Sequence, residues 1–370
     1  MRWKAVEGAL MEGTRLCRMA KLLVVVLLLL LVVHVPVRSA SSIEEDIADM
    51  ANSGMDLNAV NKDGVTMLIA AARNGNVEVV QALLKLNQVK RDVQEHAKTR
   101  QTALIAAIKA NHPQIGMLLV RAGADVNAVD SMGQTALMAA CSLGYTELVE
   151  ALIARGAVLK SVDIAGYNAL TLAASGGHDG CVRALIKAGI NLNQRVKQIG
   201  FTALSYAAAA TKVDMVKALV EAGASVNKVD TQGVPPIFHL SRNGQADIVS
   251  LLIAHGADVN IASKKIGETP LTGACSSGSL PTIQALLKAG ANVNHQEYDT
   301  GLSPLMIAAG KGHEDIVRLL LQYGADVMLR RTDGLKTTAK EAALKNGHTA
   351  VAKIIENWGK GAGEKKNESS

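Results

Sequence analysis

Aromatic residues and cysteines are scarce in this 370-residue chain. Phe, Tyr and Trp together make up 2% of the sequence, and Ala, Leu, Val and Gly carry most of the apolar content. Small apolar side chains suit thin helices that pack closely. Beyond residue 40 only Cys141, Cys181 and Cys275 remain. An odd number of cysteines spread over so long a stretch excludes a disulfide framework, so we expect three small buried side chains.

Motifs of the common catalytic and metal sites are also missing. The chain has no phosphate loop ending in Gly-Lys-Ser/Thr, no His-Glu-x-x-His and no nucleophile elbow. His178, His313 and His348 each follow a glycine, a position that favours a role in a turn over metal ligation. The sequence therefore predicts no catalysis, no cofactor and no metal ion.

Positive charge is concentrated at the N-terminus. The formal net charge is +6, but residues 1–40 hold six Lys/Arg and two Asp/Glu, which leaves 33 basic and 31 acidic residues for the rest. This nearly neutral body lacks the basic stripe of a nucleic-acid binder, so we expect no nucleic-acid partner.

Two short phrases recur along the chain. Gly123-Ala-Asp-Val-Asn127 returns as Gly256-Ala-Asp-Val-Asn260, with looser copies elsewhere. A second phrase, a Thr or its substitute followed by a small residue or Pro and usually Leu, begins at Thr66, Thr102, Thr135, Asn168, Thr202, Pro235, Thr269 and Ser303. A regular period of about 33 residues is typical of a stacked solenoid.

One repeat, from Asp130 to Val162, shows how each unit is expected to fold. Thr135 can cap a short helix that ends near Gly144, and residues 147–154 form a second amphipathic helix. Gly156 can end that helix in a left-handed conformation. Such a thin pair cannot bury its apolar stripe alone, so it must stack on copies of itself.

These residues give the chain a clear resemblance to the ankyrin repeat. The matching features are the turn Asp130-x-x-Gly133, the helix start Thr135-x-Leu137 and the Gly-Ala-Asp-Val-Asn exit, and together the copies cover about residues 43–357. The resemblance implies an all-α solenoid of stacked helix-turn-helix units with projecting β-turn fingers. It also implies a non-catalytic module that binds another protein.

The repeat pattern divides the chain into segments. We expect an N-terminal half-repeat cap at residues 41–60, eight repeats at 61–330 and a degenerate capping repeat at 331–358, about nine repeats in all. Residues 359–370 are rich in Gly, Lys, Glu and Ser, which predicts a disordered tail.

The first 40 residues have the order of a secretory signal peptide. Basic residues precede the apolar run Leu22–Val33, and small residues follow it at 39–41. Met19 would give a more ordinary start. The run is short for a membrane span, which favours cleavage and an exported protein, periplasmic or secreted, over a membrane anchor formed by residues 22–37.

Candidate binding residues lie where the repeats differ. The resemblance implies a concave groove into which the residue before each Thr position projects, and Tyr167 and Phe201 occupy this place in adjacent repeats. They form an interface hot spot in one interpretation and pack locally against neighbouring fingers in the other. Further candidates are Ile164, Ile199, Met132 and Leu143, with Arg73, Lys109 and Arg242 at the groove rim.

The sequence therefore predicts an exported protein–protein interaction module. Two alternatives stay open: a membrane-tethered scaffold that keeps its N-terminal apolar segment, and a secreted effector with an unrecognised enzymatic activity. The irregular stretch from Leu86 to Gln101, which contains Lys90, Arg91, Lys98 and Arg100, is either a solvated loop or a partner contact.

Overall fold

The computed structural model describes residues 40–95 and 99–367. The predicted leader, except for Ala40, and Lys98 lie outside these residues. In the described part, no helix is both long and apolar enough to cross a membrane.

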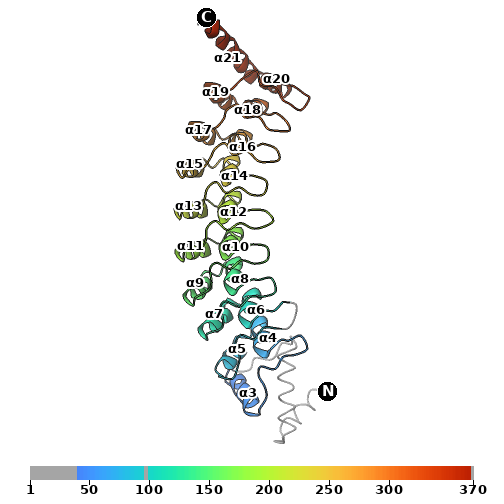
Figure 1. Ribbon diagram of the computed structural model, residues 1–370, viewed down its shortest axis with the longest axis vertical. Helices are drawn as coiled ribbons and strands as arrows, with labels where there is room; N and C mark the ends of the chain where they lie inside the picture. The colour runs from blue at the N-terminus through green and yellow to red at the C-terminus, as the bar shows by residue number, and fades with distance from the viewer. Residues whose placement is uncertain (1–39, 96–98, 368–370) are drawn as a thin grey trace. The chain divides into compact units, whose positions relative to one another are not determined.

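The chain divides into two units, residues 1–164 and 165–370, and both are built from paired helices. The described part of the first unit contains α3 (Ala40–Asn52), α4 (Met67–Asn74), α5 (Val77–Leu84), α6 (Ala103–Lys109), α7 (Pro113–Arg121), α8 (Ala136–Leu143) and α9 (Thr146–Ala154). Within this unit, the first helices of the pairs form one layer and the second helices another (Figure 1).

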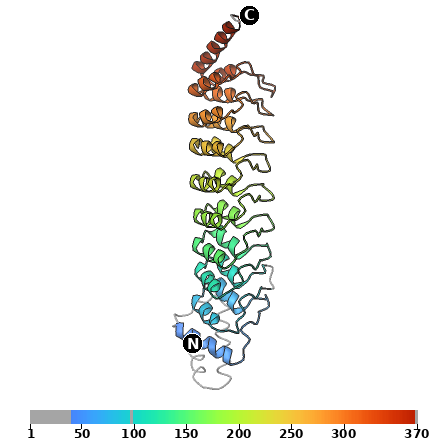
Figure 2. The same cartoon turned by 60° about the vertical axis from the view of Figure 1, so that its left-hand side comes forward.

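The second unit continues the same pattern. Its helices are α10 (Ala169–Gly176), α11 (Asp179–Lys187), α12 (Ala203–Ala209), α13 (Val213–Glu221), α14 (Pro236–Arg242), α15 (Ala246–Ala254), α16 (Pro270–Ser277), α17 (Leu280–Lys288), α18 (Pro304–Lys311), α19 (Glu314–Gln322), α20 (Ala339–Lys345) and α21 (Thr349–Asn367). The loops that precede the first helices project to one side as fingers (Figure 2). The all-α repeat solenoid is thus confirmed, with one isolated β-bridge between Val129 and Thr135.

The helix boundaries follow local sequence signals. Thr135 caps α8, and its hydroxyl accepts a hydrogen bond of 3.2 Å from the Met138 N–H. Gly144, at φ +80°, ends α8 in the left-handed region. These boundaries confirm the predicted start and stop of the first helix. The same Thr, Ser or Asn cap starts most other first helices, and Pro235 is an exception without a side-chain cap.

Small residues allow the first helices to pack closely, and larger ones fill the space beside them. Each first helix lies against the next within its unit, as α4 does against α6 and α10 against α12. The alanines in these contacts are buried, and so are Cys141, Cys181 and Cys275, as expected. In the second helices the buried residues are mainly Leu, Ile and Val. Burial of these side chains between neighbouring pairs is the main source of stability.

The Asn of the repeated phrase ties each repeat to the next. The Asn260 side chain donates to the Gly290 carbonyl at 3.1 Å and accepts from the Asn292 N–H at 2.8 Å. Asn294 makes the equivalent pair of bonds one repeat further on. In the following copy of the phrase, Met328 stands at the position of Asn260 and Asn294. It is 69% exposed and has no side-chain amide, so it cannot make the equivalent hydrogen bonds to the next repeat.

The irregular stretch after α5 packs against its neighbours in the part that the structure describes. Val89 is buried, and the Asp92 carboxylate accepts the Asp125 backbone N–H at 2.7 Å. Glu95 is also buried and pairs with Arg73. Val89 and Glu95 are thus anchored, whereas Lys90 and Arg100 are exposed, as a solvated loop predicts; a partner contact of these basic residues stays a prediction.

The C-terminal tail differs from the sequence expectation. Residues 359–370 were expected to be disordered, but α21 continues to Asn367. Extending an existing helix adds one hydrogen bond per ordered residue and needs no new nucleus. Lys and Glu in the extension are also good helix formers, which offsets the unfavourable propensity of its glycines.

Histidines at the inter-helix turns pack over glycines of the preceding repeat. Gly75, Gly278 and Gly312 end their helices with positive φ. A Cβ added at Gly75 would lie 2.5 Å from the His112 ring, and one added at Gly278 or Gly312 would lie 2.9 or 2.6 Å from the ring of His313 or His348. The predicted turn role of His313 and His348 is thus confirmed.

We expect Gly75→Ala to destabilise the first unit more than Gly123→Ala. Both glycines have φ near +80°, but Gly123 has no atom within 4 Å of an added Cβ. Gly123→Ala, the control, should lower the free energy of unfolding by about 1 to 2 kcal/mol, because alanine is strained in the left-handed region. Gly75→Ala should lower it by roughly 1 to 3 kcal/mol more, because the added Cβ clashes with His112. Urea denaturation of both variants, with and without His112→Ala, tests this, and equal losses in the two single variants would contradict it.

Candidate functional site

Three predicted apolar residues of the first unit are exposed on separate elements. Met132 lies in the finger before α8, Leu143 is the last residue of α8, and Ile164 lies in the next finger; they are 47%, 42% and 57% exposed. The Ile164 backbone N–H donates to the Met132 carbonyl at 3.1 Å, so the two fingers lie side by side. These residues present apolar surface, and their role in binding stays a prediction.

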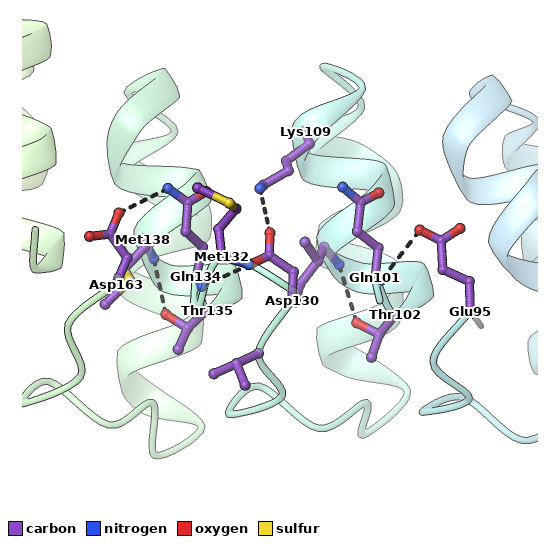
Figure 3. Close-up of polar contacts among 12 residues, drawn as sticks. Glu95, Gln101, Thr102, Lys109, Asp130, Met132, Gln134, Thr135, Met138 and Asp163 are labelled. Atoms are coloured by element: carbon purple, nitrogen blue, oxygen red, sulfur yellow. Dashed lines mark hydrogen bonds and ion pairs between the residues drawn. The ribbon is translucent and has the colours of Figure 1, made fainter. Parts of the chain in front are cut away.

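Arg73 and Lys109 have a structural role that sequence reasoning missed. Arg73 Nη2 lies 2.6 Å from Glu95 Oε2, and Lys109 Nζ lies 2.5 Å from Asp130 Oδ2. Both carboxylate side chains are almost fully buried, at 1% and 2% exposure. Each cation thus lies in the last turn of a first helix and holds the acidic residue of the following finger; Figure 3 shows the pair of Lys109 and Asp130. These two residues are therefore not free groups at a groove rim.

Asp130 organises its whole finger through the same carboxylate. Its Oδ1 accepts the backbone N–H groups of Met132 and Gln134 at 2.8 and 2.9 Å, while Oδ2 takes Lys109. Gln134 in turn donates to Asp163 at 3.2 Å (Figure 3). Removing Lys109 would leave a buried carboxylate without its counter-charge, which is costly.

The second unit brings four ring side chains together. Tyr206, on α12, lies between the two aromatic residues predicted from sequence: its hydroxyl donates to the Tyr167 hydroxyl at 3.0 Å, and its ring lies 5.1 Å from Phe201 in an edge-to-face arrangement. His239, on α14, stands 6.0 Å from Phe201. We call Tyr167, Phe201, Tyr206 and His239 the aromatic cluster. Edge-to-face contacts at these distances are favourable.

A positional signal in the sequence could have found the two missed members. Tyr206 comes four residues after Thr202, and His239 four residues after Pro235, so both occupy the same register of their first helices. One helical turn separates this register from the residues at the finger base. Tyr167 and Phe201 both contact Tyr206, so the local packing of these rings is confirmed. Their role as an interface hot spot stays a prediction.

Every member of the aromatic cluster is partly buried and partly accessible. Burial raises the pKa of Tyr206, and its hydrogen bond and charge interaction with Tyr167 act in the same direction. Burial lowers the pKa of His239; nearby Asp230 opposes this shift and Arg242 adds to it. Among the described residues, His239 Nε2 has no hydrogen-bond partner. The aromatic cluster is thus an uncharged surface at neutral pH.

The remaining predicted residues lie next to this cluster. Ile199 is 38% exposed in the finger that leads to Phe201, and its carbonyl accepts the Thr231 backbone N–H at 3.0 Å. Arg242 is exposed at the end of α14, on the same helix as His239. Thus Ile199 and Arg242 flank the cluster with an apolar and a cationic side chain.

Within the described residues, no group of three His, Cys, Asp or Glu side chains is arranged to hold a metal ion. Cys275 is fully buried, and this raises the pKa of its thiol. A buried, protonated thiol is a poor nucleophile.

Comparison with known proteins identifies the repeats. A family model described as ankyrin repeats (3 copies) matches residues 39–130, 86–163, 159–230 and 223–297, and a model described as ankyrin repeat matches residues 300–332. No curated protein matches the chain. The matches extend over most of both units, including the aromatic cluster.

We expect the His239 ring to titrate below the ordinary imidazole pKa of about 6.5. As the pH falls, the unfolded chain then takes up the proton first. The contribution of the neutral His239 ring to the stability of the folded chain is therefore fully present above about pH 6.5. This contribution is lost as the pH falls towards the folded-state pKa.

An NMR titration of the His239 ring protons, assigned by comparison with His239→Phe, measures this pKa. The variant should also lose less stability than the natural chain between about pH 7 and pH 5, the range around the free imidazole pKa. A midpoint at or above the free imidazole value would contradict the assigned environment.

Proposed function

Because the chain belongs to the ankyrin-repeat family, we propose that it is an exported, non-catalytic protein-binding module whose principal contact is the aromatic cluster of its second unit. Ankyrin repeats generally mediate binding to other proteins. The observation that carries the proposal is the convergence of Tyr167, Phe201, Tyr206 and His239 in a chain with only two Phe and five Tyr.

The aromatic cluster has the character of a binding anchor rather than of a core. Its four residues are each half-buried, whereas other apolar residues of the same helices, such as Leu204 on α12 and Leu240 on α14, are fully buried. Tyrosine rings supply large contact area at low entropic cost, because they have few rotatable bonds. Clusters of this type carry much of the binding energy in protein interfaces.

Export is proposed from the N-terminal sequence alone. The basic residues, the apolar run Leu22–Val33 and the small residues after it support a cleaved leader. The mature protein would then meet its partner in the periplasm or outside the cell. Mass measurement of the mature N-terminus decides the point, because a chain that begins near Ser41 would exclude a membrane anchor at residues 22–37.

The binding proposal predicts that Tyr167→Ala and Phe201→Ala each weaken capture of the partner. Loss of an interface anchor costs about 2 kcal/mol or more, which corresponds to roughly 30-fold in affinity. Tyr323→Ala is the matched control, since Tyr323 is 42% exposed at the end of α19 and lies outside the cluster.

The measurement is quantitative affinity capture from the native organism with the full chain and each variant as bait. Circular dichroism should show the same helix content in all baits. A partner that is retained equally by all three variants would rule out the aromatic cluster as its binding site.

A further inference from the structure

The fingers next to the aromatic cluster carry an excess of basic side chains. We call residues 194–201, 228–234 and 261–268 the basic fingers; their charged residues are Arg195, Lys197, Lys228, Lys264 and Lys265 against Asp230 and Glu268. All five basic residues are exposed. Asp230 is 7% exposed and accepts the backbone N–H groups of Gln232 and Val234. The accessible charge of these fingers is therefore positive.

Backbone contacts hold two of the cations in place without neutralising them. Arg195 donates from Nε to the Gly200 carbonyl at 3.1 Å and from Nη2 to the Val229 carbonyl at 2.9 Å. The Lys264 N–H donates to the Gln232 carbonyl at 2.7 Å, and the Lys264 stem crosses the preceding finger at Gly233, where an added Cβ would lie 2.7 Å from Cγ. The carbonyl groups that accept these hydrogen bonds carry no net charge, so Arg195 and Lys264 keep their positive charge uncompensated.

Arg195, Lys228, Lys264 and Lys265 make no ion pair with an acidic side chain of the described residues. The ion pairs of the second unit that involve other cations include Arg330 with Glu341, Arg331 with Asp333, and Lys340 with Glu356, all outside these fingers. By contrast, Arg73 and Lys109 of the first unit are paired with buried acids. Cations that make no internal ion pair are available for a partner.

Apolar side chains lie among these cations. Ile199 and Ile266 are each 38% exposed, and they occupy equivalent places in the first and third basic fingers. Phe201 ends the first of these fingers and belongs to the aromatic cluster. The next finger beyond them, residues 295–302, instead has no Lys or Arg and carries the exposed Asp299, which ends the positive surface on that side.

We propose that the basic fingers and the aromatic cluster together bind an extended, acidic segment of a partner protein. Its carboxylates pair with Arg195, Lys264 and Lys265, and a large apolar side chain between them contacts the aromatic cluster. This inference rests on the proposed function and adds the chemistry of the partner. Complementary charge steers such a segment to the surface and fixes its direction, while the rings supply most of the affinity.

The size of the segment follows from the repeat spacing. Arg195 and Lys264 lie two repeats apart, which is about 20 Å at the usual distance between packed helices. An extended chain covers this distance with about six residues. Peptides of about 12 residues, which span about 40 Å when extended, are therefore long enough to engage both ends of the surface.

The test is selection of such peptides from a random phage-displayed library on the purified full chain. Selected peptides should be enriched in Asp and Glu around a large apolar residue. Their affinity should fall about 10-fold with the double variant Lys264→Glu/Lys265→Glu, and it should weaken with added salt. The matched control, Lys187→Glu/Lys217→Glu, makes the same charge change on exposed positions of α11 and α13 and should bind normally.

The outcomes separate this inference from the function on which it rests. Peptides that need Phe201 but are not acidic, or are insensitive to the Lys264/Lys265 double variant, would overturn the acidic partner and leave the binding module intact. Peptides that need neither Phe201 nor the lysines would contradict both proposals. Binding of single-stranded DNA through Lys264 and Lys265, with no acidic peptide selected, would identify a nucleic-acid surface and overturn the inference.

Discussion

The constraint on which the structure depends is that no helix pair in this chain can bury its own apolar face. In α19, for example, Ile316, Val317, Leu320 and Leu321 are all buried although the helix has only nine residues. Such a short amphipathic helix is not stable alone, so its burial requires neighbouring pairs. Small residues in the first helices and the row of Asn side chains follow from this need, because they let identical units approach and keep their register.

Stacking also explains how distant residues come to share one surface. In every repeat, the residue at the base of the finger and the residue four positions after the helix cap occupy equivalent places in the stack. Tyr167 and Tyr206 are 39 residues apart in sequence, yet their hydroxyl groups form a hydrogen bond. The frame is nearly invariant, whereas the side chains at these positions vary from Gln134 to Phe201. We therefore propose that binding specificity resides in the variable positions, and stability in the repeated ones.

Local features could be predicted from the sequence, and contacts between repeats could not. The cap at Thr135 and the stops at Gly144 and Gly156 depend on neighbouring residues and on φ, and the structure has them as expected. The pairing of Lys109 with Asp130 and the place of Tyr206 between Tyr167 and Phe201 depend on which side chains face each other across repeats. Tyr167 and Phe201 occupy one equivalent position of their repeats, before the helix cap, whereas Tyr206 and His239 occupy another, four residues after it, so the repeat pattern alone does not show that the two positions meet.

We propose that the stacked frame stays unchanged on binding while the aromatic cluster and its adjoining fingers make the contact. Hydrogen–deuterium exchange of the full chain, alone and with its captured partner, distinguishes these regions. We expect slower exchange in residues 194–206 and 228–242 on binding, with no change in α11, α13 and α15. Protection confined to those second helices, with none in the fingers, would contradict it.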